Sequence, residues 1–117
     1  MTLTEFLDKI QSHQKVAFDE TLAVIDAHYD YRPTEFRNGL GDKTLINEAG
    51  KNEGSCKIFA FAQLNGLDER QTLNLFGDYY RLDVLNDPNG SSHQNIRHFM
   101  QYGWQGIQFD TMPLSLK

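Results

Sequence analysis

The sequence predicts a mainly α-helical single domain of about five helices, with a short strand pair or an irregular glycine-rich region between residues 30 and 50. Three observations lead to this prediction. Apolar residues recur at helical spacing over most of the chain, four of the nine glycines lie between residues 39 and 54, and 117 residues suffice for one core but not for two. No internal repeat or linker divides the chain, so residues 1–117 are expected to form one domain.

Two amphipathic helices are predicted at the N-terminal end. Thr2 and Glu5 have the spacing of a capping box, and the apolar residues that follow predict a helix over about residues 3–12. A second helical stripe, at steps of four, three and four, consists of Phe18, Leu22, Ile25 and Tyr29. Both stripes are expected to face the core.

The chain between residues 29 and 54 is predicted to be extended or irregular. Alternating aromatic residues and Pro33 favour an extended segment, which ends at the turn pair Asn38-Gly39. Glycine and asparagine are frequent after this turn, and only residues 44–46 have the composition of a brief strand.

Two longer helices are predicted in the middle of the chain. Ser55 is a suitable N-cap for a helix that is apolar on most sides and ends before Gly66. Asp68 and Gln71 repeat the capping-box spacing, and an apolar stripe predicts one helix from about 69 to 85. This helix would contain Gly77 at a cost of roughly 1 kcal/mol relative to alanine.

The last predicted helix has about ten residues and follows the serines at 91 and 92. It is expected to end before Gly103. The tail then reads as a short extended element that joins the strands, with Trp104, Ile107 and Phe109 as its apolar residues.

Composition excludes several functional classes. The chain has 11 Lys and Arg against 16 Asp and Glu, so its net charge of -5 disfavours nucleic acid as a partner. No apolar run approaches the 18 or more residues that span a bilayer, and the N-terminus lacks a basic signal region, so neither a membrane span nor a cleavable signal is expected. No motif indicates a cofactor. His93 and His98 are five positions apart, which on a helix turns them to different faces, and Cys56 is the only thiol, so a zinc site would have too few ligands.

The single cysteine, Cys56, is the candidate nucleophile. One residue after a predicted N-cap, it would lie where the helix dipole stabilises a thiolate. His93 and Asp110 follow in the order Cys, His, Asp that some cysteine hydrolases and acyltransferases use. The pattern therefore allows a catalytic set of Cys56, His93 and Asp110, while a small buried cysteine without chemistry is the alternative.

Several side chains are candidates for binding rather than catalysis. The predicted helix start near Lys57, together with Lys51 and either Arg81 or Arg97, is compatible with a small bound anion. The dense run of phenols and charges over residues 77–83 offers Tyr79 and Arg81 to a partner. Structural pairing of Arg81 with a neighbouring carboxylate is the alternative.

Four separated segments carry a resemblance to a known family. They are Phe36-Arg37-Asn38-Gly39, residues 52–57 (Asn-Glu-Gly-Ser-Cys-Lys), residues 76–81 (Phe-Gly-Asp-Tyr-Tyr-Arg) and residues 93–100 (His-Gln-Asn-Ile-Arg-His-Phe-Met). In this order they resemble the HopJ type III effector family, over about residues 3–114.

The resemblance implies a small soluble binding or interaction protein of unknown biochemical activity. Its partner would be an unknown protein or a small polar ligand. The protein would act in the bacterial cytoplasm or after export by a type III secretion system. The positions that the resemblance marks as candidates for a shared site are Asn38, Asn52, Cys56, Arg81, His93 and Arg97. A cysteine-dependent hydrolase or acyltransferase that uses Cys56 with His93 is the alternative.

Export makes a separate demand on the N-terminal segment. The first dozen residues should then be dispensable for folding, whereas Leu3, Phe6 and Ile10 predict a helix packed on the core.

Overall fold

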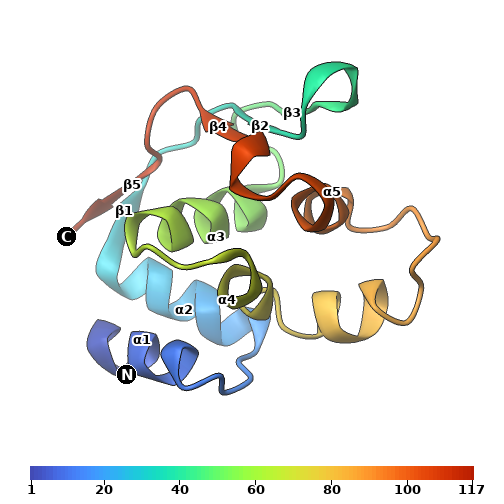
Figure 1. The fold of residues 1–117 in the computed structure, drawn as a ribbon. Helices are drawn as coiled ribbons and strands as arrows, with labels where there is room; N and C mark the ends of the chain where they lie inside the picture. Colours follow the sequence, from blue (N-terminus) through green and yellow to red (C-terminus); the bar gives the residue numbers. More distant parts are fainter.

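The computed structural model describes all of residues 1–117, and helices form most of it (Figure 1). The α-helices are α1 (Leu3–Gln11), α2 (Phe18–His28), α3 (Glu53–Leu64), α4 (Glu69–Asn74) and α5 (Gln94–Tyr102). Three shorter helical segments are η1 (Gly41–Lys43), η2 (Tyr79–Val84), which is a π-helix, and η3 (Gly103–Gly106). The predicted helix-rich fold with a small strand component is confirmed.

The strands are short and form two antiparallel sheets. In the larger sheet, β2 (Phe36–Asn38) lies between β3 (Leu45–Asn47) and β4 (Ile107–Phe109). The extended tail at residues 107–109 therefore joins the strands, as predicted. The smaller sheet pairs β1 (Tyr29–Tyr31) with β5 (Leu114–Leu116), and β5 was not predicted. Figure 1 shows the larger sheet at one end of the helical body.

The central element of the core is α3. Its residues 58–62 are all fully buried, and α3 lies between α2 and the part of the chain that contains α5 and the sheet (Figure 1). The Phe59 ring packs against four other aromatic rings at centroid distances of 5.0–6.5 Å; these belong to Phe36, Phe76, Phe99 and Trp104. Tertiary burial on all sides thus explains why the α3 sequence has no polar stripe.

The N-terminal helix α1 is part of this core. Thr2 and Glu5 form the predicted capping box, and their hydrogen bonds lower the pKa of the Glu5 carboxyl. Phe6 and Ile10 are both buried, and the Phe6 ring contacts the Phe61 ring of α3 at 6.0 Å. The first dozen residues are therefore built into the fold.

The prediction of one helix over residues 69–85 is wrong, because the chain breaks at Gly77. Helix α4 ends at Asn74, Gly77 adopts φ +63°, and η2 begins at Tyr79. A Cβ atom at Gly77 would lie 2.6 Å from the backbone nitrogen of Phe18. Gly77 therefore ends a helix and permits a close approach of two backbone segments.

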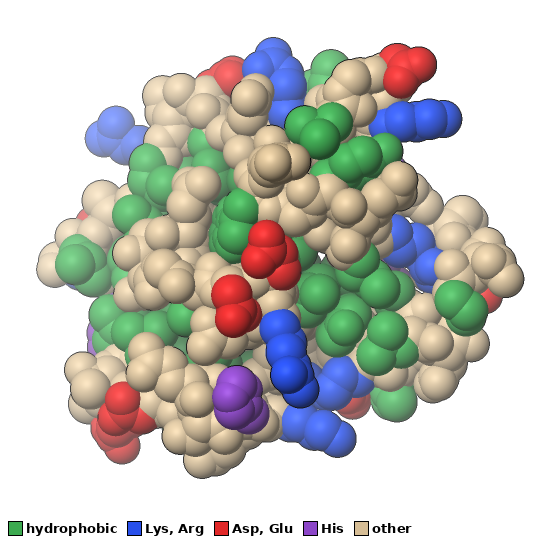
Figure 2. Space-filling view, in the orientation of Figure 1, with side chains coloured by type: hydrophobic (Ala, Val, Ile, Leu, Met, Phe, Trp, Pro, Cys, Tyr) green, Lys and Arg blue, Asp and Glu red, His purple; other side chains and the backbone are tan.

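Charges are mixed on the surface seen in Figure 2. Lys and Arg side chains lie scattered among acidic and hydrophobic ones and do not form one continuous basic surface on this face. Such a surface is what proteins that track a phosphate backbone present. No helix is long and apolar enough to cross a membrane.

Candidate functional site

A cavity of about 500 Å³ lies between the N-terminal ends of α3 and α5, next to η2. The aromatic rings that line it belong to Phe18, Phe76 and Tyr79. Polar residues from the two helix starts also line it; they are Asn52, Ser55, His93, Gln94 and Asn95. Apolar walls with a few convergent polar groups are the usual composition of a small-molecule site.

The two helices present their N-terminal ends to this cavity in the same way. Each N-cap residue has left-handed backbone geometry, with φ 53° at Asn52 and φ 51° at His93, and neither side chain caps its own helix. Backbone N–H groups in the first turns therefore have no acceptor within the protein; among the residues that line the cavity these are Gly54, Ser55, Gln94 and Asn95. The cavity is consequently rich in free donors.

The N-cap of α3 differs from the prediction. Asn52 fills this position and its carbonyl accepts from Cys56 N at 3.0 Å, so Ser55 lies inside the first turn instead of capping it. Asparagine tolerates the left-handed conformation better than most residues do. This local preference is why the helix begins earlier than its serine suggests.

Two contacts hold the His93 side chain in place at the start of α5. Its Nε2 lies 3.0 Å from Asp83 Oδ2, and its ring packs on Tyr79 at a centroid distance of 5.0 Å. Tyr79 packs in turn against Phe18 at 4.9 Å in an edge-on arrangement. Residues from α2, η2 and the start of α5 thus contact one another where they line the cavity.

Cys56 lies apart from the cavity. Its side chain is 1% exposed, next to Tyr31 and the backbone of Thr34. Burial raises the pKa of the Cys56 thiol to about 11, although hydrogen bonds with Tyr31 and Thr34 act in the opposite direction. Burial is the largest of these contributions, so the pKa of the thiol is raised, whereas its place in the first turn of a helix had suggested a lowered one.

The structure does not bring the three catalytic candidates together. Cys56 contacts Tyr31, the His93 ring bonds to Asp83, and the half-exposed Asp110 lies 4.0 Å from an Arg37 nitrogen. No hydrogen bond joins any two of the three. Of this set, only His93 lines the cavity.

The binding candidates divide into two groups. Asn52 and Tyr79 line the cavity, and Asn38 lies behind it, hydrogen-bonded to Asn95. Lys57 does not line it; its Nζ lies 2.9 Å from Asp26 Oδ1 and 4.9 Å from the centre of the Tyr31 ring.

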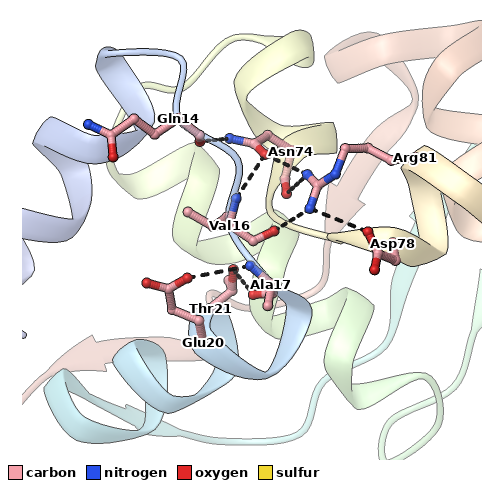
Figure 3. Close-up of polar contacts among 8 residues, drawn as sticks. All are labelled: Gln14, Val16, Ala17, Glu20, Thr21, Asn74, Asp78 and Arg81. Atoms are coloured by element: carbon pink, nitrogen blue, oxygen red, sulfur yellow. Dashed lines mark hydrogen bonds and ion pairs between the residues drawn. The ribbon is translucent and has the colours of Figure 1, made fainter.

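The two arginines also have partners elsewhere. Arg81 donates to Asn74 Oδ1 at 2.8 Å and to Val16 O at 2.6 Å, and it lies 3.7 Å from Asp78 (Figure 3). Arg97 donates to the carbonyls of Asp87 and Ser92. Both guanidinium groups hydrogen-bond backbone carbonyls of neighbouring segments, and neither arginine lines the cavity.

Sequence reasoning missed several residues of this cavity. Asn95 and Gln94 belong to the segment 93–100 that carries the family resemblance, but nothing in their spacing connects them with residues 52–55. Phe18 reads as an ordinary core position of an amphipathic helix. The left-handed tolerance of asparagine at 52 is the one local signal of an unusual helix start.

Cys56 is expected to react slowly in the folded protein. With a folded pKa near 11 against 9.0 for a free thiol, the thiolate fraction at pH 8 is about 100-fold lower than in the unfolded chain. Iodoacetamide should therefore modify native protein at least about 100-fold more slowly than protein in denaturant. Because the folded pKa is the higher one, the thiol should also destabilise the fold as the pH rises from 9 to 11.

The control for this measurement is the same reaction in denaturant, followed by mass spectrometry. A native rate equal to or above the denatured rate would show an accessible, activated thiol and would restore the cysteine-dependent hypothesis.

No group of three or more His, Cys, Asp or Glu side chains lies close enough together to hold a metal ion.

The fold and the cavity define a small helix-rich domain with a polar pocket between two helix starts. The family profile described as HopJ type III effector protein matches residues 3–114, so the chain belongs to this family. It is also similar to a solved structure described as the crystal structure of the unknown function protein VPA0580. The two are 50% identical with a TM-score of 0.94, over 100% of this chain and 95% of the other. No curated protein matches the chain.

Proposed function

We propose that this HopJ domain is a binding protein, and that the cavity between α3 and α5 takes a small ligand with a planar apolar part and a polar edge. The observation that carries the proposal is the composition of the cavity. Three aromatic rings and free backbone donors from two helix starts line the same cavity. The Phe18 and Tyr79 rings are inclined at 72°, so a planar molecule would stack on one ring and contact the edge of the other while its polar edge meets the backbone donors.

The size of the cavity supports a small molecule. Its volume of about 500 Å³ falls within the range of roughly 300–1,000 Å³ typical of ligand pockets. No Lys or Arg side chain lines it, so the proposal does not require a highly charged ligand. A protein partner would need a wider surface than this cavity offers.

The cysteine-dependent hydrolase or acyltransferase is the alternative function. It requires the Cys56 thiol to reach a substrate beside His93, and the alkylation measurement above decides this point.

A fragment screen by nuclear magnetic resonance tests the proposal. We expect planar polar fragments to shift the backbone amide signals of Ser55, Gln94 and Ile96 in ¹⁵N-labelled protein. Ser55→Phe should abolish these shifts because the ring fills the cavity. Ser115→Phe is the matched control, since Ser115 is exposed on β5. A library that shifts none of the cavity signals, or shifts that persist in Ser55→Phe, would contradict the proposal.

We also propose that this domain acts in the bacterial cytoplasm or after export through a type III secretion system, and the description of its family as type III effector proteins supports this. Deletion of residues 1–12 tests whether the fold can dispense with the N-terminal segment, as an export signal there would require. Because Phe6 and Ile10 are buried, the deletion should lower the melting temperature by about 10 °C or more. Removal of the exposed Met1 alone is the control. An unchanged melting temperature would instead indicate a disposable leader.

A further inference from the structure

Four asparagine side chains connect the larger sheet to both walls of the cavity. Asn38 comes from β2, Asn47 from β3 and Asn95 from α5, and Asn52 is the N-cap residue of α3. Asn38, Asn47 and Asn95 are 0%, 1% and 7% exposed, while Asn52 and Asn95 line the cavity. Buried amides of this kind are costly unless their hydrogen bonds are made, and among the buried amide atoms of this cluster only Asn38 Oδ1 has no partner.

The orientations of these amides follow from one backbone carbonyl. Asn95 O can only accept, so Asn38 must turn its Nδ2 toward it, at 2.8 Å. The same Nδ2 lies 3.1 Å from the side chain of Asn95, which therefore presents Oδ1. Asn95 Nδ2 then faces Asn47 at 2.9 Å, and the Asn47 atom that receives it must be Oδ1.

The next link fixes Asn52. Asn47 Oδ1 also lies 2.7 Å from the Asn52 side chain, so Asn52 must donate from Nδ2. A second backbone carbonyl agrees with this assignment, because Asn47 Nδ2 lies 3.5 Å from Phe36 O. Asn52 Oδ1 accepts no hydrogen bond within the protein, and Asn52 lines the cavity together with Gly54 and Ser55, whose N–H groups are also free.

His93 repeats this arrangement at the start of α5. Its Nε2 faces a carboxylate oxygen of Asp83, so in the neutral ring Nε2 carries the hydrogen and Nδ1 is an acceptor. Free N–H groups of Gln94 and Asn95 follow it along the helix. Each helix start therefore presents an acceptor on its N-cap side chain and donors on the next residues.

We infer that Asn47 is a positioning residue, and that the Asn52 orientation it sets makes the cavity selective for planar cyclic amides, in which an N–H donor stands beside a carbonyl acceptor. The inference rests on the proposed function, because it names the ligand class of the same cavity. The ligand N–H donates to Asn52 Oδ1, and the ligand carbonyl accepts from the backbone N–H groups that open α3. A ring that lacks the N–H leaves Asn52 Oδ1 without a partner once water is displaced.

Three uracil derivatives that differ in their N–H and methyl groups test this selectivity in titrations of ¹⁵N-labelled protein. Uracil and 5,6-dimethyluracil carry N–H groups beside carbonyls, whereas 1,3-dimethyluracil has the same number of methyl groups as the second probe but no N–H. Both N–H probes should bind about tenfold more tightly than 1,3-dimethyluracil, which is the usual effect of one unpaired polar group. Equal affinities of the two dimethyl probes would overturn the inference.

Substitutions at Asn52 test which atom is responsible. Asn52→Gly removes the amide and keeps the left-handed backbone, so the tenfold preference should fall to about onefold. Asn52→Asp loses the donor to Asn47 Oδ1 but keeps an acceptor oxygen for the ligand N–H, so it should retain the preference. Both variants change an exposed residue, so the fold is expected to survive. A preference that survives in Asn52→Gly would contradict the inference.

A substitution at Asn47 tests its positioning role. Asn47→Ala leaves Asn52 free to turn either amide atom toward the ligand, so the affinity ratio of the two dimethyl probes should shrink toward one. A merely structural role would weaken all probes equally and leave this ratio unchanged, which would overturn the role of Asn47. If Asn47→Ala does not fold, the Asn52 pair still decides the ligand class.

The outcomes separate this inference from the proposed function. If other planar fragments shift the cavity signals but no uracil does, the ligand class is wrong and the proposed function stands. If no fragment shifts them at all, both fail.

Discussion

Gly77→Ala is expected to destabilise the domain by about 3 kcal/mol or more. Two costs combine at this position. Alanine is strained at φ +63°, and its Cβ would lie 2.6 Å from the Phe18 backbone nitrogen, an atom that cannot move without displacing the start of α2. Urea denaturation followed by circular dichroism measures the free energy of unfolding.

Gly41→Ala is the matched control for this prediction. Gly41 has nearly the same backbone angle, φ +60°, but a Cβ there would have no atom within 4 Å. It should cost only the conformational strain, about 1 kcal/mol. Equal losses for the two variants would mean that the contact with Phe18 does not contribute.

Phe59→Ala should lower the free energy of unfolding by about 4 kcal/mol. The Phe59 ring is fully buried and packs on Phe36, Phe76, Phe99 and Trp104, so its removal leaves a cavity where α3 meets the sheet, α5 and the chain after α4. Chemical denaturation again provides the measurement.

Leu64→Ala serves as the control on the same helix. Leu64 is a large apolar residue that is 47% exposed, so its truncation should cost less than about 1 kcal/mol. A loss for Phe59→Ala as small as that for Leu64→Ala would show that the aromatic cluster is not the main contributor to the core.

Features that depend on neighbours in the chain were predictable from sequence. The capping boxes at Thr2 and Asp68 are both present because each needs only two residues three positions apart. The buried character of α3 followed from its continuous apolar run. The extended conformation of residues 107–109 was likewise expected from their composition.

Features that depend on distant contacts were not predictable. The break at Gly77 is required by the approach of Phe18, which is far away in the sequence, whereas the apolar stripe continues past the break. Strand β5 is only three residues long and exists because β1 pairs with it. No local pattern reports either contact.

The candidate site shows the same division. Asn52, Tyr79 and His93 were singled out from segments 52–57, 76–81 and 93–100, and the cavity includes all three. Asn47 could not be recognised from the sequence, because its side-chain hydrogen bonds join β3 to Asn52 at the start of α3 and to Asn95 in α5. Cys56 drew attention as the single thiol, yet its burial depends on packing that spacing does not encode.

The pairing of β1 with β5 has a consequence for the order of folding. Tyr29 lies opposite Leu116, so this small sheet joins two segments that are far apart in the sequence. Closing so long a loop costs conformational entropy before the strand contacts can offset it. We therefore expect the β1–β5 ladder to form late in folding, after the helices α1 to α3 have packed together.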